Sequence, residues 1–370
     1  MATKSVLVMN TGSSSLKWVV LDASSETVQQ HGEARWQGAE GGQHQDELAQ
    51  ALGQVRGVDA IGHRVVHGGL AFGDPVLVDE PVRQEISRLA ELAPLHNPAA
   101  LAGMEAARQR FPDVPQVATF DTAFHRDMPE PAAVYPVPWE WTTRWHVRRF
   151  GFHGLNVAYT VERAQQILGH LPRRLVVCHL GAGCSVTAVE DGHSINTSMG
   201  FTPLEGTMMV QRSGSIDPGL VTYLLTRGGL SAEDVDRGLN QNSGVLGVSG
   251  ISTDVREVLA AAASGHARAR LTRDMFVHRL VETIGGMVAS LGGLDTLIFT
   301  GGIGEHSAEI RAAACASFDF LGLRVDTERN LADPVDSDIA ADRSQVRVLV
   351  IAAREDLAIL RQVRRVLDWR

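Results

Sequence analysis

Residues 6–17 have the sequence VLVMNTGSSSLK, and this stretch indicates how the N-terminal half of the chain folds. Residues 6–9 predict a buried strand, residues 10–15 a polar turn and residues 16–21 a second strand, which together form a β-hairpin. A Walker loop instead leads from a strand into a helix, and its G-x-x-x-x-G-K-S/T spacing is absent from this stretch. The turn still offers backbone N–H groups, three hydroxyls and the Lys17 ammonium to a phosphate. A solvated turn is the simpler alternative.

The second half of the chain repeats this pattern. Residues 175–180 predict a strand, residues 181–183 a Gly-containing turn and residues 184–190 a second strand. The Asp191-Gly192 pair then predicts a further hairpin. Each half therefore opens with a strand, a turn and a strand, which indicates an internal repeat of architecture without residue identity. Residues 128–147, with four prolines and three tryptophans, are interpreted as the crossing between two domains.

The remaining elements follow from hydrophobic periodicity and capping residues. Further strands are predicted at residues 60–66, 116–120, 194–198, 296–300 and 346–351. Helices are predicted at residues 97–111, 217–227, 231–240, 266–291, 305–315 and 355–369. Residues 30–50 are polar and rich in Gly and Gln, and they are predicted to form a surface excursion.

The composition limits the class of protein. A length of 370 residues suggests two or three domains. With 44% hydrophobic and 21% charged residues, the chain is excluded from the disordered, collagen-like and coiled-coil classes. The formal charge of −9 argues against broad binding of nucleic acid or anionic membranes, and no apolar stretch approaches the ~18 residues of a membrane span. The three scattered cysteines disfavour a disulfide framework, so we expect a reduced, cytoplasmic protein.

Polar side chains and Gly-rich turns gather near the ends of predicted strands. The turn at residues 301–304 opens a helix, so its free N–H groups and the helix dipole favour a phosphate, with a tight connection as the equal alternative. Turns of the same kind lie at residues 10–15 and 181–183. A cleft that handles anions between two domains is therefore predicted, formed by these turns and by Arg64, Asp121, His153 and Arg212.

Eight segments resemble the signatures of the acetate kinase family. They are residues 6–17, 62–69, 94–98, 120–125, 151–154, 197–205 with 212–218, 243–250 and 299–305. The resemblance covers nearly the whole chain and implies an α/β fold of two ribonuclease-H-like (actin-like ATPase) domains around a central nucleotide cleft, usually as a homodimer. Residues 1–125 with the closing helix at 356–370 are then expected to form an acyl-substrate domain. Residues 126–355 are expected to form a nucleotide-binding domain.

The resemblance also implies a reaction: reversible transfer of the ATP γ-phosphoryl group to acetate, giving acetyl phosphate and ADP, with Mg²⁺ or Mn²⁺. A carboxylate has a pKa of about 4–5, so the nucleophile is ionised at neutral pH without a strong base. The difficulty is the repulsion between two anions, so catalysis consists of positioning and charge neutralisation. Val66 is retained at the implied methyl pocket, which favours acetate over longer acids.

Individual residues receive roles from the resemblance alone. The implied catalytic residues are Arg64, Asp121, His153 and Arg212. The implied acyl site consists of Arg64, Val66, Leu95, Phe152 and Pro203. The nucleotide is expected to meet Lys17, His179, Leu180, Gly181, Ala182, Gly183, Asp254, Val255, Arg256, Gly302, Ile303, Gly304, Glu305 and His306. The metal is expected at Asn10 and Glu355. The alternatives are structural: helix caps for the acidic residues, and ordinary core packing for the histidines and apolar residues.

Three positions depart from the family pattern. Ala182 and His306 each stand where the family usually has Asn, and Ala353-Arg354 replaces Thr-Asn beside the implied metal site. The alternatives that remain open are a propionate or other short-chain acyl kinase, a donor other than ATP, a nucleotide-binding homologue with little turnover, and a phosphohydrolase. The presence of all four implied catalytic residues favours an enzyme.

Overall fold

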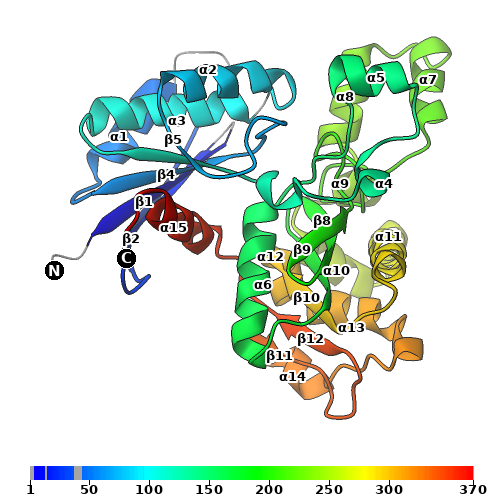
Figure 1. Ribbon diagram of the computed structural model, residues 1–370. Helices are drawn as coiled ribbons and strands as arrows, with labels where there is room; N and C mark the ends of the chain where they lie inside the picture. Colours follow the sequence, from blue (N-terminus) through cyan, green and yellow to red (C-terminus); the bar gives the residue numbers. More distant parts are fainter. Residues whose placement is uncertain (1–3, 13–14, 37–43, 95, 370) are drawn as a thin grey trace. The chain divides into compact units, whose positions relative to one another are not determined.

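The computed structural model describes residues 4–12, 15–36, 44–94 and 96–369, and the chain divides into two compact units (Figure 1). Unit 1 comprises Met1–Arg126, Phe152–Tyr159 and Arg354–Arg370, and unit 2 comprises Asp127–Gly151 and Thr160–Ala353. The boundaries expected from the sequence are 125/126 and 355/356. They do not include the segment 152–159, where the chain returns to unit 1. They also assign Glu355 to the second domain, whereas it belongs to unit 1.

Unit 1 is built on one six-stranded sheet with helices on both faces. Its elements are β1 (Ser5–Thr11), β2 (Ser15–Asp22), β3 (Val28–Arg35), α1 (His44–Gly53), β4 (Ala60–Val65), β5 (Val76–Leu77), α2 (Glu80–Arg88), α3 (Asn97–Arg110), β6 (Gln116–Phe120) and α15 (Glu355–Val366). Helix α6 (Gly154–Leu168) begins in unit 1 and continues into unit 2.

Unit 2 contains a second six-stranded sheet. Its strands are β7 (Arg174–Leu180), β8 (Cys184–Glu190), β9 (His193–Thr197), β10 (Thr296–Thr300), β11 (Ser337–Asp338) and β12 (Arg347–Val350). Its helices are α4 (Glu130–Ala133), α5 (Trp139–Trp145), α7 (Pro218–Thr226), α8 (Ala232–Gln241), α9 (Gly244–Ser249), α10 (Val255–Ala263), α11 (Ala267–Leu291), α12 (Gly301–His306), α13 (Ala308–Ala316) and α14 (Thr327–Leu331).

The two sheets share one topology, which confirms the internal repeat. Their strand orders are β3-β2-β1-β4-β6-β5 and, written from the other edge, β9-β8-β7-β10-β12-β11. In each sheet the first strand pairs antiparallel with the second and parallel with the next central strand, which in turn pairs parallel with a further strand. A two-residue strand then pairs antiparallel at the far edge of each sheet. The predicted hairpin turn at Asp191-Gly192 is also present, with φ of +48° and +83° at its two residues, as a type I′ turn requires.

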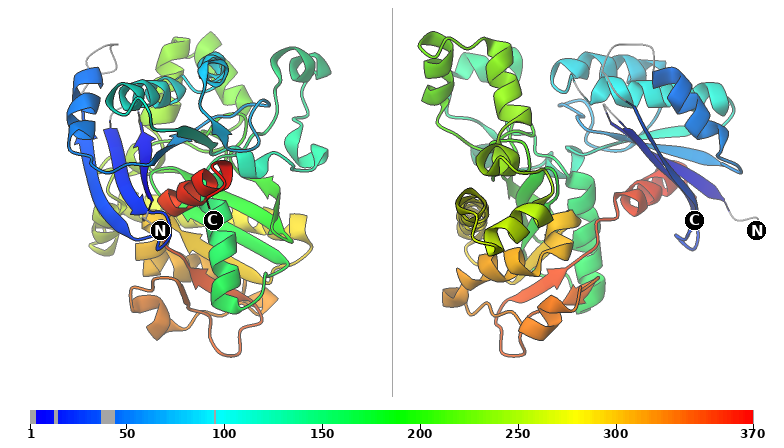
Figure 2. Two further views of the ribbon diagram at one scale, coloured as in Figure 1. Left: turned by 60° about the vertical axis from the view of Figure 1, so that its left-hand side comes forward. Right: turned by 180° about the vertical axis from the view of Figure 1, so that it is seen from behind.

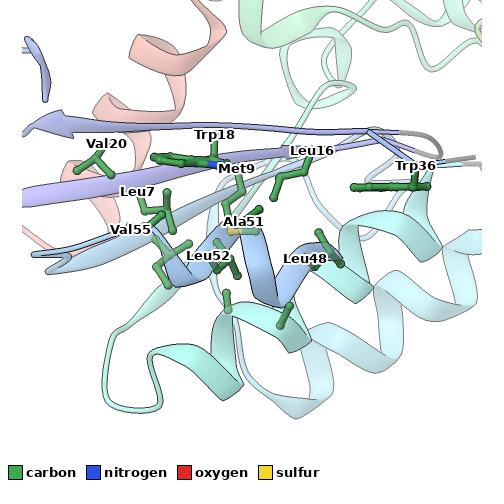
Figure 3. Packing of buried hydrophobic residues seen from close by; sticks show 13 residues of the cluster. Leu7, Met9, Leu16, Trp18, Val20, Trp36, Leu48, Ala51, Leu52 and Val55 are labelled. Atoms are coloured by element: carbon green, nitrogen blue, oxygen red, sulfur yellow. The ribbon is translucent and has the colours of Figure 1, made fainter. Parts of the chain in front are cut away.

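Alternation along the strands of unit 1 directs side chains to two cores. Leu7, Met9 and Ile61 pack with helices α1 and α3, as Figure 3 shows for the labelled members of this cluster. A Cβ on the neighbouring Gly62 would meet Ile359 of α15, so this helix covers the opposite face of the sheet, as Figure 2 also shows. The central strands are therefore buried on both faces, which explains the continuous apolar run of β1.

Several local predictions need correction. The described parts of residues 30–50 are not an excursion, because they include most of β3 and the start of α1, and residues 37–43 lie outside the described residues. Strand β3 pairs only with β2, so it is an exposed edge strand with a polar sequence, and α1 contributes only Leu48, Ala51 and Leu52 to the core cluster. Residues 128–147 form α4 and α5 within unit 2. The helix predicted at 305–315 is two helices, α12 and α13, and helices α9 and α10 have no counterpart in the prediction. Within the described residues, no helix has the length and apolar content needed to cross a bilayer.

Two buried histidines predict a loss of stability in acid. Burial lowers the pKa of both His63 and His125 to about 4. Unfolded histidine binds a proton below pH 6.5 and these folded ones do so only near pH 4. Each is therefore expected to remove about 3 kcal/mol of unfolding free energy as the pH falls from 7.5 to 4. Urea unfolding across this range should show a shallower pH dependence for the double variant His63→Gln/His125→Gln. His31→Gln, on the exposed strand β3, should match the wild type, and an unchanged slope in the double variant would contradict the prediction.

Candidate active site

Three neighbouring parallel strands of unit 1 end at one edge of its sheet. Asn10 lies near the end of β1, Arg64 near the end of β4, and Asp121 directly follows β6. The Asp121 N–H donates to the Val65 carbonyl at 3.0 Å, so it continues the ladder between the last two strands. Because ligands of open α/β sheets bind beyond the carboxyl ends of parallel strands, this edge is the expected position for a site.

The Arg64 guanidinium holds these side chains together. It donates to both carboxylate oxygens of Asp121, with Nε at 3.2 Å from Oδ1, and its Nη1 lies 3.3 Å from Asn10 Oδ1. A second carboxylate comes from the first residue of α15, where Glu355 Oε2 lies 3.3 Å from Arg64 Nε. Sequence positions 10, 64, 121 and 355 are thus brought to one cluster, as the resemblance implied for these residues.

Burial controls the charges in this cluster. Asp121 is fully buried, and this burial raises the pKa of its carboxyl, Arg64 lowers it and Glu355 raises it again, so that the pKa is about 7. For Arg64, burial opposes the charged form, but attraction from Asp121 and Glu355 outweighs it and raises the pKa. The guanidinium therefore remains a cation beside two carboxyl groups, fixed by hydrogen bonds in one orientation.

His153 precedes a glycine whose backbone packs directly against Asp121. The N–H of Gly154 donates to the Asp121 carbonyl at 2.8 Å, and a Cβ at position 154 would lie 2.3 Å from that oxygen. His153 itself has a φ of +59°, which side-chain-bearing residues rarely adopt. Backbone strain of this kind concentrates at functional sites, where surrounding contacts enforce it.

The implied acyl-site residues are distributed over both units. Val66 and Phe152 are buried in unit 1, and the Phe152 ring packs edge-on against His67 with 5.5 Å between ring centroids. Pro203 belongs to unit 2, and Leu95 lies outside the described residues. Lys17 is exposed on β2 and directly opposite Asn10 in the hairpin register, so both side chains extend from the same face of the sheet.

Unit 2 contains a separate pocket of about 800 Å³. It is lined by the β7–β8 turn, the start of α10 and helix α12. Eight residues of the implied nucleotide set line it: Gly181, Ala182, Asp254, Val255, Arg256, Gly302, Ile303 and His306. Five others of that set do not line it, although they lie at the end of β7, in the β7–β8 turn or on α12: His179, Leu180, Gly183, Gly304 and Glu305. The volume is within the range of small-molecule sites.

Five lining residues were missed in the sequence, namely Val210, Gln211, Thr253, Leu259 and Ser307. Helical spacing identifies Leu259, because it follows Val255 by four residues on α10. No local signal identifies Val210 and Gln211, which are held by backbone hydrogen bonds to Ala182, Leu246 and Ser243.

Arg212 of unit 2 is a half-buried cation without a carboxylate. Its Nη1 donates to the Pro203 carbonyl at 3.2 Å, and no described acidic side chain lies within ion-pairing distance of it. Burial lowers the pKa of Arg212, and the neighbouring Cys184 offsets this only in part. A partly desolvated guanidinium without a counter-ion favours the binding of an anion.

The structure gives partners to the residues that depart from the family pattern. Arg354 forms a forked pair with Asp356, with 2.8 Å between Nη2 and Oδ2, so its charge is balanced next to Glu355. His306 lies at the pocket with Nδ1 3.2 Å from the exposed Asp333 carboxylate. Ala353 donates its N–H to Glu305 Oε1 at 3.0 Å, which ties helix α12 to the segment before Glu355.

Alanine substitutions at two adjacent glycines are expected to differ in their effect on stability. Gly301 has a φ of +76°, and a Cβ there would lie 2.8 Å from the Leu180 carbonyl oxygen, whereas a Cβ on Gly302 meets nothing within 4 Å. Gly301→Ala is therefore expected to lower the unfolding free energy by about 2 kcal/mol or more and to weaken nucleotide binding, because α12 must move. Gly302→Ala should unfold like the wild type. Thermal melts and nucleotide titrations test this pair, and equal stability of the two variants would contradict it.

The side-chain oxygens of Asn10 and Glu355 are suitable ligands for a magnesium ion. Both supply oxygen, and both direct an oxygen to the same guanidinium, so they face one space. Mg²⁺ is usually held by one or two carboxylates together with water and substrate phosphates, which this sparse donor set matches.

The whole chain resembles solved kinase structures. It superposes on a crystal structure of a propionate kinase from Francisella tularensis with a TM-score of 0.89 and 36% identity, over 97% of this chain and 98% of that chain. The Porphyromonas gingivalis acetate kinase structure gives a TM-score of 0.89 and 34% identity, over 98% of this chain and 100% of that chain. The fold is thus the α/β actin-like ATPase fold, used here by a class of phosphotransferases.

Sequence comparison defines the family. The chain matches the Acetokinase family over residues 43–361. It is 53% identical to the acetate kinase of Trichormus variabilis over 84% of this chain and 77% of that protein. It is 44% identical to the acetate kinase of a Cyanothece species over 96% of both. The chain belongs to the acetokinase family, whose members are phosphotransferases.

Proposed function

We propose that this protein transfers the γ-phosphoryl group of ATP to acetate, reversibly, giving acetyl phosphate and ADP. The observation that carries the proposal is the Arg64 guanidinium, held by Asp121, Glu355 and Asn10 at the carboxyl edge of the unit 1 sheet. A fixed cation at this edge suits the binding of a small carboxylate. The identity of 53% to an acetate kinase supports acetate as the acceptor.

In the proposed reaction, an acetate oxygen attacks the γ-phosphorus and the bond between that phosphorus and the β–γ bridging oxygen breaks. The electron pair of the broken bond stays on ADP. No base is required, because the attacking acetate is already ionised at neutral pH. Arg64 and Arg212 neutralise the charge of the carboxylate and the migrating phosphoryl group, and His153 stabilises its oxygens. Asp121 orients Arg64 through two hydrogen bonds. Preorganised charges of this kind are the main source of catalysis in phosphoryl transfer.

We assign the acyl substrate to unit 1 and the nucleotide to the pocket of unit 2. The proposed acyl-site residues are Val66, Leu95, Phe152 and Pro203. The pocket residues from the β7–β8 turn, α10 and α12 are proposed to hold ATP, with Lys17 directed to its phosphates. Asn10 and Glu355 would hold Mg²⁺ or Mn²⁺, which, when bound, neutralises phosphate charge.

We further propose that the protein is a cytoplasmic homodimer. Helix α5 exposes three tryptophans, Trp139, Trp141 and Trp145, at 68%, 45% and 50%. Large exposed aromatic groups are typical of interaction surfaces. All three cysteines are free and buried, which suits a reducing compartment. The molar mass in solution, measured by light scattering, tests the oligomeric state.

The proposal is tested by trapping the acyl phosphate with hydroxylamine. The assay contains ATP, Mg²⁺ and one of formate, acetate, propionate or butyrate, and we expect the strongest signal with acetate. Propionate stays in the panel because one methylene changes discrimination by only ~1–3 kcal/mol, and because a propionate kinase is a close structural relative. ATP hydrolysis that does not depend on any acid would instead indicate a phosphohydrolase.

The variant Ala182→Asn measures what one departure from the family pattern costs. Ala182 is exposed in the nucleotide pocket, so a new amide there has room to donate to a phosphate. We expect kcat/KM for ATP to rise by about 5- to 10-fold, as one added hydrogen bond of about 1 kcal/mol allows.

In the acid panel with the wild-type protein, no signal with any acid, despite measurable nucleotide binding, would contradict the ATP-dependent kinase. Pyrophosphate and GTP are then the donors to test.

A further inference from the structure

Three side chains of unit 2 form a polar cluster outside the sites described above. We call Tyr135, Arg149 and Glu205 the Tyr135 cluster. The Tyr135 hydroxyl donates to Glu205 Oε2, Arg149 Nη2 lies 2.7 Å from Glu205 Oε1, and the Arg149 guanidinium stacks over the Tyr135 ring at 5.4 Å. Burial raises the pKa of Tyr135, so its hydroxyl stays a donor. A charge-assisted network of this kind is rigid.

The Tyr135 cluster fixes the backbone of one loop. Arg149 Nη1 donates to the carbonyls of residues 197, 198 and 199 at 3.0, 3.0 and 3.2 Å. The N–H of Phe201 donates to the Tyr135 oxygen at 2.9 Å. Gly200 lies between these contacts, and a Cβ there would overlap both Glu205 Oε2 and the Tyr135 hydroxyl. The cluster therefore sets the course of residues 197–205 on both sides of this glycine.

This loop leads to two residues of the proposed chemistry. The Pro203 carbonyl accepts from Arg212 Nη1 at 3.2 Å, so the loop anchors the side chain of Arg212. The Gly200 carbonyl accepts from the N–H groups of Phe150 and Gly151 at 3.0 and 3.3 Å. Gly151 precedes Phe152 and His153 in the chain. Displacement of the loop is thus transmitted to Arg212 directly and to His153 through the backbone.

The nucleotide pocket is lined by residues outside this cluster and its loop. None of its lining residues belongs to residues 197–205, and Val210 and Gln211 are held by hydrogen bonds to Ala182, Leu246 and Ser243. A substitution in the Tyr135 cluster should therefore reduce phosphoryl transfer to the acid more than it reduces ATP binding.

We infer that Tyr135, Arg149 and Glu205 are positioning residues, which hold the 197–205 loop and, through the Pro203 carbonyl, the side chain of Arg212. The inference rests on the proposed function. None of the three touches the reacting atoms in this account, and each acts through the loop.

The test compares Tyr135→Phe with Tyr223→Phe, since Tyr223 is exposed on α7 and forms the matched control. Tyr135→Phe keeps the ring beneath Arg149 and removes only the hydroxyl. We expect kcat/KM for acetate to fall roughly 10- to 100-fold, as small misplacements of catalytic groups do. The dissociation constant for ATP should stay within about twofold, because that pocket is anchored separately. Tyr223→Phe should match the wild type in both.

Glu205→Gln carries the same test if Tyr135→Phe does not fold. Its amide oxygen still accepts from Arg149, so the loss should be smaller than that of Glu205→Ala, and this graded rescue would support a positioning role. The inference would be overturned if Tyr135→Phe lost ATP affinity as much as kcat/KM for acetate. It would also be overturned if kcat/KM for acetate stayed within twofold of the wild type. If the wild-type protein forms no acyl phosphate, the proposed function fails and the inference fails with it. If the wild type is active and Tyr135→Phe is unaffected, only the inference fails.

Discussion

Replacing Arg212 by alanine is expected to lower kcat for acetyl phosphate formation by about 10³-fold, as loss of a transition-state arginine does in other phosphoryl transfers. Arg212 is half-buried, and among the described residues its side chain contacts only the Pro203 carbonyl and the Met209 sulfur, with no carboxylate to balance its charge. The charge of this arginine is therefore available to an anion, and removal of the side chain breaks no ion pair of the fold. The dissociation constant for ATP should change by less than about threefold, because the lining of the nucleotide pocket does not include Arg212.

Two further variants complete this experiment. Arg212→Lys keeps a positive charge but loses the planar fork, so its kcat should fall between those of the wild type and of Arg212→Ala. Arg227→Ala removes an exposed arginine at the end of α7 and should leave kcat unchanged. A wild-type kcat in Arg212→Ala, or an equal loss of kcat and ATP affinity, would contradict the role of Arg212 at the phosphoryl group.

Asp121→Asn is the second change with a large expected effect, about 10⁴-fold in kcat, the scale seen when a buried orienting carboxylate becomes an amide. Asp121 binds the Arg64 guanidinium through both carboxylate oxygens. An asparagine accepts with one oxygen only, and its NH₂ group would face the guanidinium donors, so Arg64 must turn. The fold should tolerate the change, because Glu355, 3.3 Å from Arg64 in the unaltered protein, still supplies a counter-charge.

The stability of Asp121→Asn separates a catalytic role from a structural one. Burial raises the pKa of Asp121 to about 7. The unfolded chain therefore loses this proton first, so the cost to folding grows from about pH 4 and is complete above pH 7, and an amide avoids it. At pH 8 with EDTA, the variant should melt within a few degrees of the wild type. Asp113→Asn, an exposed aspartate just before β6, is the matched control and should behave as the wild type. A fall in melting temperature large enough to explain the lost activity would contradict an orienting role.

Much of the fold was predictable because its central strands carry strong local signals. Strands β6, β8 and β10 have the predicted bounds, since each is a buried run that ends at a turn. The hairpins and the repeat of strand, turn and strand are also confirmed. By contrast, β3 and α1 were missed, because an edge strand and a surface helix bury too few side chains to leave a hydrophobic period.

For the site, the motifs indicated which residues to examine, and the family comparison explains why the motifs are so complete. They could not show that Arg64 holds Asp121, Asn10 and Glu355 together, because these four residues are far apart in the chain, between positions 10 and 355. Nor could they show that Arg354 is balanced by Asp356 beside the proposed metal site. The pocket residues Val210 and Gln211, and the Tyr135 cluster, likewise carry no local pattern.

The sequence by itself determined the two sheets, the Gly-rich turns and the identity of the charged residues, because strand periodicity and turn chemistry are properties of neighbouring residues. The tertiary structure alone decided which of those charges are paired and which is not. Asp121 neutralises Arg64, whereas Arg212 has only a carbonyl and a sulfur within reach among the described residues. Burial and charge pairing depend on segments that are distant in the chain, so they exist only once the parallel strands have aligned their ends.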